Sequence, residues 1–194
     1  MNHPFYVETP IKFDENTGLG NCEKPALERR YSNMKNMYLD EEARAGKEAA
    51  GDDLIYNFYE LGVPEKEGEL AYGTSIVYPG KVGNEYHMTN GHFHTILDTA
   101  EIYYCQAGHG VMMMESPEGD VLYKEMKKGE AVYVPGRYAH RSINVSETET
   151  LITFYVFRAD AGHDYGSIKE KGFRKLVVEE EGSWKVIDNP RWNG

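Results

Sequence analysis

Four residues in the middle of the chain have side chains that could bind a metal ion together. His92 and His94 are two positions apart, so on an extended strand both imidazoles would leave the same face of the sheet. A third histidine, His140, and a carboxylate, Glu101, would complete a set of nitrogen and oxygen ligands for a divalent transition metal. A lone histidine is more often a surface or hydrogen-bonded structural residue, so the function depends on whether these four side chains meet.

The sequence around the two distant residues favours such a meeting. Glu101 begins the apolar run 101–105, where a lone carboxylate would be costly to bury without a cation. His140 follows Gly129 and Pro135 at a spacing that describes a strand, a tight turn and a second strand starting at the histidine. That hairpin could bring His140 beside the first pair.

The elements that must position these residues are expected to be mostly strands. Apolar residues at helical spacing among charged ones predict a helix within residues 24–50, which Gly51 ends. From Leu54 onward, apolar runs alternate with turn residues. Strands are expected at 54–59, 72–78, 101–106, 111–115, 121–126, 131–134, 140–145 and 151–157, and a last hairpin is expected to pair 176–180 with 184–187.

Many short strands spaced about ten residues apart are typical of a β-sandwich or barrel. No repeat, low-complexity tract or linker interrupts them. We therefore expect residues 1–194 to form a single all-β domain. Its parts would be an N-terminal extension over about 1–50, a barrel over about 54–160 and a C-terminal hairpin over about 174–190.

The charge of the chain limits its partners. Lys and Arg together number 21, while Asp and Glu number 32, which gives a net charge of −11. Such a balance argues against nucleic acid or an anionic membrane surface as the main partner. A phosphorylated substrate would have to be held by local neutralisation, by a metal or by backbone N–H groups.

The sequence gives no reason to expect a location outside the cytoplasm. There is no run of about 18 apolar residues, and residues 1–15 show no targeting pattern. Two cysteines, Cys22 and Cys105, do not make a disulfide framework, so a reducing cytoplasm is the expected compartment. Cys105 lies in an apolar run and is expected to be buried and inert.

Two runs resemble the paired motifs of the cupin superfamily, namely Glu101…Gly108 and Gly129…Pro135…His140…Asn144. That family binds a metal through three histidines and one glutamate inside a small double-stranded β-barrel. The chain departs from the pattern in two ways. Six residues separate His94 from Glu101 where three or four are usual, and Arg137 stands where the second motif usually has glycine.

Longer strings resemble one group of cupins, the cupin-type glucose-6-phosphate isomerases. The resemblance runs from about residue 50 to the C-terminus. Its strings are YPGKVG (78–83), GHFH (91–94) with LD (97–98) and AE (100–101), VYVP (132–135) with AHR (139–141), ADAGHDYG (159–166), EKGF (170–173) and DNPRW (188–192). It implies an all-β double-stranded β-helix, or jelly-roll barrel, with a short N-terminal helical segment, and by analogy a homodimer.

The resemblance implies that His92, His94, Glu101 and His140 are metal ligands, with one divalent metal per subunit. Iron is the first expectation, with manganese, nickel, cobalt and zinc as alternatives. The chemistry of the side chains agrees, because three imidazoles and a carboxylate suit all of these ions. Ligand softness does not choose among them.

The implied reaction interconverts glucose 6-phosphate and fructose 6-phosphate, a step of glycolysis and gluconeogenesis. In one mechanism a base moves a proton between C2 and C1 through a cis-enediol. Glu101 is the candidate base, and we favour this route because the motif places no other carboxylate at the metal. In the other mechanism a hydride shifts directly between the two carbons.

The resemblance also implies residues that contact the sugar phosphate. Ser75, Thr89 and Gly91 match the family's phosphate donors, with Ser75 in place of an expected threonine, and Tyr56 and Tyr103 match pocket tyrosines. Without the resemblance, the first three would be exposed strand hydroxyls and a turn glycine, and the tyrosines would be core aromatics.

His163 matches a family histidine that would move a proton at the ring oxygen when the sugar opens. Its alternative role is a loop histidine that bonds to Asp164. Phe157 stands where a pocket tyrosine is expected, and Arg137 replaces an aromatic residue. If Arg137 faces the pocket, it could supply positive charge to the phosphate. His87 and His109 match no functional residue and are expected to be structural or exposed.

Two rival functions use the same ligands. One is an iron-dependent dioxygenase of the same fold, for which the phosphate donors and the His163 loop would have no purpose. The other is a non-catalytic domain that only binds sugar phosphates, against which the complete ligand set with Glu101 argues.

Overall fold

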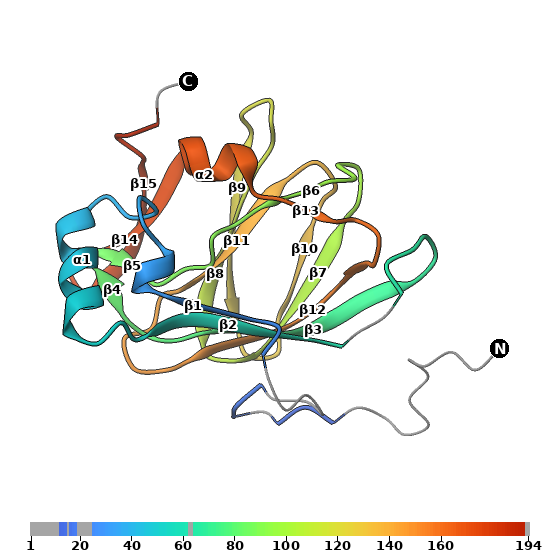
Figure 1. The fold of residues 1–194 in the computed structure, drawn as a ribbon, viewed down its shortest axis with the longest axis horizontal. Helices are drawn as coiled ribbons and strands as arrows, with labels where there is room; N and C mark the ends of the chain where they lie inside the picture. The colour runs from blue at the N-terminus through green and yellow to red at the C-terminus, as the bar shows by residue number, and fades with distance from the viewer. Residues whose placement is uncertain (1–11, 15, 19–24, 62–63, 193–194) are drawn as a thin grey trace.

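The computed structural model describes residues 12–14, 16–18, 25–61 and 64–192 (Figure 1). Its helices are the 3₁₀ helix η1 (Tyr31–Asn33), α1 (Glu41–Ala50) and α2 (Gly166–Lys171). Its strands are β1 (Leu27–Arg30), β2 (Leu54–Leu61), β3 (Leu70–Val77), β4 (Lys81–Val82), β5 (Glu85–Tyr86), β6 (Phe93–His94), β7 (Glu101–Ala107), β8 (His109–Glu115), β9 (Val121–Lys127), β10 (Ala131–Val134), β11 (Ala139–Asn144), β12 (Leu151–Arg158), β13 (His163–Asp164), β14 (Lys175–Glu180) and β15 (Ser183–Asp188).

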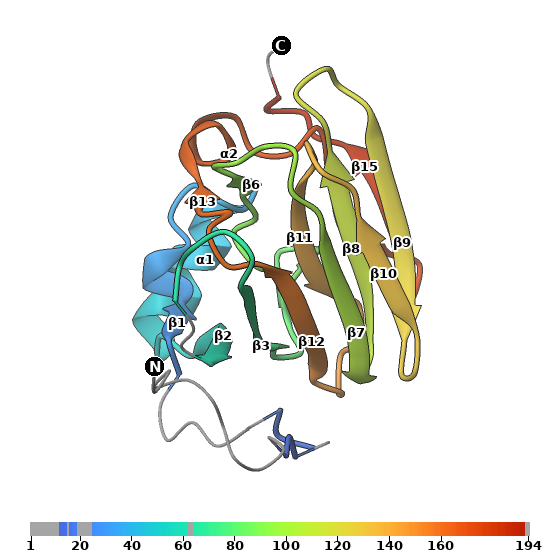
Figure 2. The same ribbon diagram turned by 90° about the vertical axis from the view of Figure 1, so that its right-hand side faces the viewer.

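Two antiparallel sheets form a barrel, and the chain alternates between them. The larger sheet has the order β1-β2-β3-β12-β7-β10, and the smaller has the order β11-β8-β9. From β7 the chain enters the smaller sheet in β8 and β9, returns in β10, crosses again in β11 and returns in β12. Figure 2 shows the strands of both sheets along the barrel wall. This alternation is the double-stranded β-helix expected from the sequence, and the fold is an all-β cupin.

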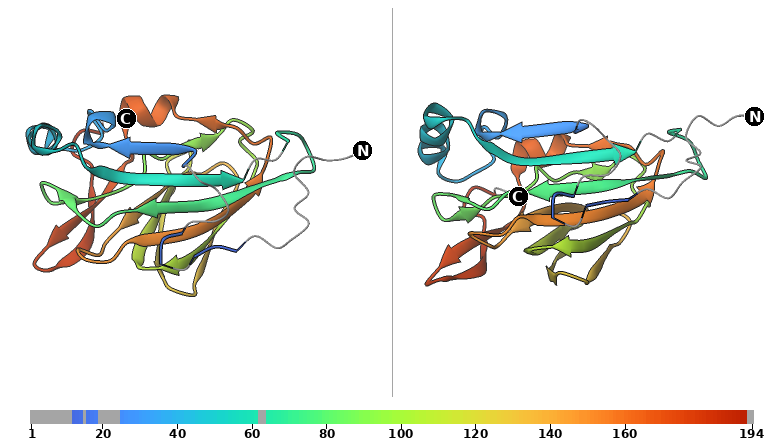
Figure 3. Two further views of the ribbon diagram at one scale, coloured as in Figure 1. Left: turned by 60° about the horizontal axis from the view of Figure 1, so that its bottom comes forward. Right: turned by 90° about the horizontal axis from the view of Figure 1, so that it is seen from below.

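Two smaller sheets complete the molecule. β6 pairs with β13 at the mouth of the barrel, and the hairpin β14–β15 pairs with β5 and β4. Figure 3 shows this hairpin and α1 at the same end of the molecule.

The two-residue period of a strand decides which side chains enter the barrel. On β7, Glu101, Tyr103 and Cys105 are buried, whereas Ile102 and Tyr104 between them are exposed. The pattern places Glu101 inside the barrel at the start of its strand. Every barrel strand predicted from the sequence is present, with ends that differ by at most two residues.

The N-terminal region differs from the predicted helix. Only Glu41–Ala50 is α-helical, whereas Leu27–Arg30 is an edge strand paired with β2. Met34 and Tyr38 are almost fully buried and lie in an irregular segment that packs on the core. Their apolar side chains therefore reflect burial in the core and not a helix. The helix begins where the Asp40 side chain accepts a hydrogen bond from the Ala43 N–H at 2.8 Å.

The short elements around the site were not predicted. β4, β5, β6 and β13 have two residues each, too few to show a period. The helix α2 has six residues. Among the described residues, no helix is long and apolar enough to cross a membrane.

Candidate functional site

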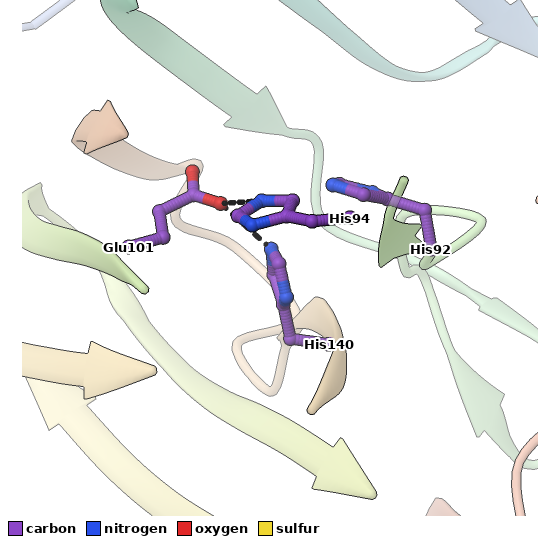
Figure 4. A group of neighbouring side chains, drawn as sticks. All are labelled: His92, His94, Glu101 and His140. Carbon is purple, nitrogen blue, oxygen red and sulfur yellow. Dashed lines mark hydrogen bonds and ion pairs between the residues drawn. The ribbon is translucent and has the colours of Figure 1, made fainter. Parts of the chain in front are cut away.

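The four predicted metal ligands meet inside the barrel. One potential ligand atom from each of His92, His94, Glu101 and His140 lies within 4.8 Å of the others. The Oε2 atom of Glu101 is 3.2 Å from His94 Nε2 and 2.9 Å from His140 Nε2. Figure 4 shows the three imidazoles and the carboxylate directed toward one another.

The ligands come from separate elements rather than from one long strand. His94 lies in the two-residue strand β6, and His92 precedes it, joined to His140 by a pair of backbone hydrogen bonds. Glu101 reaches the cluster from β7 in the larger sheet, whereas His140 reaches it from β11 in the smaller. The expectation that an extended chain directs the two imidazoles of His92 and His94 together holds, although the strand is much shorter than assumed.

Hydrogen bonds orient two of the imidazoles. His94 Nδ1 is 2.8 Å from Thr99 Oγ1 and 3.1 Å from the Thr99 carbonyl oxygen. His140 Nδ1 is 3.3 Å from the carbonyl oxygen of Tyr138. A proton donated from Nδ1 to either carbonyl leaves the Nε2 lone pair of that histidine free to bind a metal.

The side chains fit a divalent metal. His92 Nε2 is buried and has no hydrogen-bond partner among the described residues, and His140 Nε2 is buried with the Glu101 carboxylate 2.9 Å away. Buried polar atoms of this kind normally have a partner, and a cation would provide one. The set of three nitrogens and one carboxylate suits a first-row transition metal.

The charges within the cluster favour the protonation states in which Glu101 and His92 can bind a metal. Burial opposes ionisation of Glu101, but the adjacent His140, His94 and His92 outweigh it and hold the pKa of the carboxyl well below its usual range. Burial, and then the neighbouring His140 and His163, hold the pKa of His92 well below its usual value. At neutral pH the carboxylate is therefore ionised and this imidazole is neutral, which are the forms that bind metals.

A pocket opens beside the four residues and contains every predicted substrate residue. Its lining residues are Tyr56, Phe58, Glu60, Ser75, Thr89, Asn90, Gly91, His92, Glu101, Tyr103, His140, Ser142, Tyr155, Phe157, His163 and Tyr165. No lysine or arginine is among them. His94 lies behind this lining, stacked on Phe157 with ring centroids 5.6 Å apart.

The predicted phosphate donors are not ordinary surface residues. Ser75 is buried, and Thr89 Oγ1 accepts a hydrogen bond from the Ser142 N–H at 3.1 Å. Gly91 has a φ of 76°, and a Cβ there would lie 2.6 Å from the ring of Phe173. Glycine is therefore required at this point of the pocket wall.

The two predicted pocket tyrosines are buried. The Tyr56 hydroxyl accepts a hydrogen bond from the Asn90 N–H at 3.4 Å, and burial raises the pKa of Tyr56 to about 12. Burial and the neighbouring Glu101 carboxylate raise the pKa of Tyr103 well above its usual value. Both hydroxyls remain protonated at neutral pH.

His163 lies at the mouth of the pocket. Its strand pairs with the strand of His94, and its ring centroid is 4.4 Å from that of His92. The residue is exposed on one side, while desolvation of its packed side lowers its pKa. Asp164 accepts a hydrogen bond from Gly166 at 2.9 Å, and no bond from His163 to Asp164 is present.

Phe157 and Arg137, which replace aromatic residues expected in the pocket, have different outcomes. Phe157 lines the pocket, so a hydroxyl is absent there. Arg137 does not line it: the side chain is exposed and pairs with Glu118 and, at 3.6 Å, with Asp98. The condition for a contribution of Arg137 to phosphate binding, that it faces the pocket, is not met.

The remaining histidines and the cysteine behave as structural residues. His87 is buried, with Nε2 3.0 Å from the Tyr31 hydroxyl, and His109 pairs with Glu125 at 2.7 Å. Cys105 is buried, and burial raises the pKa of its thiol to about 11, which makes it unreactive. Cys22 lies outside the described residues.

Six lining residues were not predicted from the sequence, namely Phe58, Glu60, Asn90, Ser142, Tyr155 and Tyr165. Ser142 follows His140 by two positions, so the strand period could have placed it on the same face. Tyr165 follows His163 by two positions and stacks on it, with centroids 6.1 Å apart. Glu60 follows Tyr56 by four positions on β2, so the same strand period places both on the face that borders the pocket.

Comparison with known proteins gives a consistent result. Residues 28–193 match the family described as glucose-6-phosphate isomerase (GPI). The glucose-6-phosphate isomerase of Thermococcus litoralis is 46% identical over 94% of this chain and 95% of its own. That of Pyrococcus furiosus is 45% identical over the same shares, and that of Sinorhizobium medicae is 39% identical over 92% and 85%.

A solved oxalate oxidase is a more distant likeness, with a TM-score of 0.48 and 16% identity over 59% of this chain and 56% of its own. The sequence relatives span nearly the whole chain and share one description. The chain therefore belongs to the cupin-type glucose-6-phosphate isomerase family.

Proposed function

We propose that this protein is a metal-dependent isomerase that interconverts glucose 6-phosphate and fructose 6-phosphate. The observation that supports this most directly is the cluster of three histidines and Glu101, all but His92 fully buried, beside a pocket that also holds Ser75, Thr89 and Gly91. The family relatives named for the same reaction add support.

In this proposal His92, His94, Glu101 and His140 hold one divalent metal per subunit, with iron as the first choice and manganese, nickel, cobalt or zinc as alternatives. When bound, such an ion supplies Lewis-acid polarisation of the sugar oxygens at C1 and C2. The unpartnered Nε2 atom of His92 and the closeness of His140 Nε2 to the Glu101 carboxylate support the ligand assignment.

Glu101 is the proposed base. Its carboxylate is ionised, buried and shielded from bulk water, so it can accept a proton from C2 and return it to C1 through a cis-enediol. The protonated hydroxyl of Tyr103 beside it is a suitable hydrogen-bond donor to the carboxylate or the sugar.

His163 is proposed to assist ring opening. Its neutral imidazole at the mouth of the pocket can transfer a proton to or from the ring oxygen. The phosphate is proposed to bind at the Ser75 and Thr89 hydroxyls and the Gly91 N–H, with Tyr56 supporting the neighbouring backbone.

The decisive experiment measures isomerisation of glucose 6-phosphate with the purified protein, together with its metal content, before and after chelation. We expect activity that is lost with the chelator, is restored by a divalent metal and persists without oxygen. A requirement for oxygen would favour the dioxygenase, and binding of the sugar phosphate without turnover would favour the non-catalytic domain.

The hydrogen transfer is tested by running the reaction in deuterated water. The enediol route predicts solvent deuterium in the product. Product without deuterium after a single turnover is expected both for a hydride shift and for a proton shielded from solvent. The number of deuterons after repeated turnovers separates these cases, because a shielded proton exchanges slowly whereas a shifted hydride never does.

We also propose a homodimer in the cytoplasm. The outer face of β7 and β10 carries three exposed apolar side chains, Ile102, Tyr104 and Tyr133, which support an interface there. The sugar phosphates of the proposed reaction are cytoplasmic metabolites, and the free thiol of Cys105 suits a reducing compartment.

A further inference from the structure

If the protein acts on a sugar phosphate, as proposed above, its pocket has to bind a negative charge without a cationic side chain in the lining. The substrate would carry a doubly charged phosphate, the chain has a net charge of −11, and no lysine or arginine lines the pocket. Hydroxyls and a backbone N–H alone are weaker phosphate ligands than cationic side chains. A source of positive charge outside the lining would resolve the problem.

Arg141 is such a source. It is 3% exposed and lies on β11 between His140 and Ser142, both of which line the pocket, so the strand period directs Arg141 to the opposite face. An arginine side chain stays protonated in proteins, so this buried guanidinium carries a positive charge at neutral pH.

The guanidinium forms no direct ion pair with a carboxylate among the described residues, and the charges of Glu85 and Glu115 act on it from beyond ion-pair distance. Its Nη2 donates to the carbonyl oxygen of Asn90 at 2.7 Å, its Nη1 contacts Met88 Sδ at 2.9 Å, and its Nε is unpartnered. It lies over the ring of Phe173, 4.1 Å from the centroid. A buried charge with no carboxylate in direct contact depends on its hydrogen bonds. The shortest of these bonds goes to the Asn90 carbonyl oxygen.

That carbonyl belongs to the same peptide unit as the Gly91 N–H. All described peptide bonds are trans, so the C=O and N–H of this unit point in opposite directions. The carbonyl faces Arg141, and Gly91 lines the pocket. The Gly91 N–H has no acceptor in the part of the chain that the structure describes.

We infer that Arg141 is a positioning residue for the substrate phosphate, acting through the peptide between Asn90 and Gly91. Its hydrogen bond fixes the orientation of the peptide and withdraws electron density from the carbonyl, which strengthens the Gly91 N–H as a donor on the other side. The phosphate thus experiences positive charge without touching a cationic side chain.

The packing of the loop supports this role. A Cβ on Gly91 would collide with the Phe173 ring and approach the His140 carbonyl oxygen at 3.1 Å. The same ring stacks on Arg141. Gly91, Phe173 and Arg141 therefore form one packed unit that holds the peptide between the guanidinium and the pocket.

The test compares wild type with Arg141→Gln and Arg141→Lys, each loaded with the same metal. Loss of one charge-assisted contact predicts that Arg141→Gln raises KM for glucose 6-phosphate about tenfold and changes kcat less than about threefold. Arg141→Lys, which keeps the charge, is expected to recover part of the loss. The inhibition constant of glucose 6-sulfate, a single negative charge, should rise less than the KM of the doubly charged phosphate.

Arg44→Gln is the matched control. Arg44 is equally buried, but its partners are Glu41, Glu48 and the Tyr31 carbonyl, away from the pocket. The Arg44→Gln protein should be less stable than wild type but have the same KM for glucose 6-phosphate. Equal losses for phosphate and sulfate in Arg141→Gln, or a fall in kcat alone, would contradict the inference and indicate a merely structural arginine.

A second measurement depends on neither turnover nor the glutamine variant. In the zinc-loaded protein, the Gly91 amide proton should shift downfield in the NMR spectrum on addition of glucose 6-phosphate, and the shift should be smaller in Arg141→Lys. An unchanged Gly91 signal, or equal shifts in both proteins, would overturn the inference. If wild type shows the shift but no isomerisation, the proposed function fails while the role of Arg141 stands.

Discussion

At the scale of single residues, Glu101 has to serve two purposes. It lies within ion-pair distance of two imidazoles and is also the carboxylate best placed to move a proton. A carboxylate whose pKa is held low by neighbouring histidines is a good ligand and a weaker base. The proposed mechanism therefore depends on how the substrate changes the surroundings of this one side chain.

Replacing Glu101 with glutamine separates these contributions. Glu101→Gln keeps the shape of the side chain but removes its basicity, so kcat should fall by about a thousandfold. Steady-state kinetics and elemental analysis together check this, because loss of the metal would produce inactivity for a different reason. Glu125→Gln, on an exposed glutamate of β9, should retain full activity.

His87 gives a pH dependence that is independent of the metal ligands. Burial lowers its pKa from 6.5 to about 4, so the folded protein excludes a proton that the unfolded chain binds below pH 6.5. Its stabilising contribution is complete above pH 6.5 and is lost as the pH falls toward 4, by roughly 3 kcal/mol.

The comparison uses His87→Gln, which can still bond to the Tyr31 hydroxyl and the Tyr78 carbonyl but cannot ionise. Denaturant unfolding between pH 7 and pH 4.5 should show a smaller loss of stability in the variant than in wild type. Parallel curves for the two proteins would show that His87 does not carry the effect.

At the scale of elements, the strands were predictable and their short connections were not. A strand such as β7 shows its inward and outward residues in its own sequence, and Gly129 and Pro135 mark the turns beside it. β6 and β13 exist because Phe93–His94 and His163–Asp164 pair across 70 residues of chain, which no local pattern reveals. The segment before Asp40 resembled a helix because its core-facing apolar residues happen to recur at helical spacing.

Part of the candidate site was likewise predictable from the sequence, and part was not. The identity of the metal ligands and of the pocket residues came from motifs and from resemblance to a family. The contribution of Arg141 did not, because it depends on which face of β11 borders the loop at Asn90. A contact between a side chain and a distant carbonyl leaves no trace in the composition of either segment.

Gly91 and Gly129 provide a prediction at this scale. Both have positive φ, but a Cβ at Gly129 meets nothing within 4 Å, whereas one at Gly91 meets Phe173 and His140. Alanine at Gly129 should cost about 1 kcal/mol through backbone strain, and alanine at Gly91 roughly 2 kcal/mol more through overpacking. Equilibrium unfolding of the two variants measures the difference, and equal costs would mean that the loop yields freely around the new methyl group.

At the scale of the whole molecule, the proposed dimer is the main untested expectation. Ile102 and Tyr133 are directly paired neighbours on β7 and β10, and both point outward. Glutamate at both positions should convert the dimer to a monomer, because two charges would be buried without partners. Light scattering coupled to size exclusion measures the mass, with Leu70→Glu as the control for an exposed apolar residue elsewhere. A dimer that persists would place the interface on another face.

The alternation of the chain between two sheets has a mechanical consequence for the metal. Glu101 belongs to the larger sheet and His140 to the smaller. An ion bound by both residues would therefore cross-link the two sheets of the barrel. Since the unfolded chain has no such site, saturation at a thousand times the dissociation constant would add about 4 kcal/mol to the stability. Scanning calorimetry should therefore record a melting temperature that falls on chelation and recovers with metal. The side chains that bind the metal for catalysis would then also stabilise the fold.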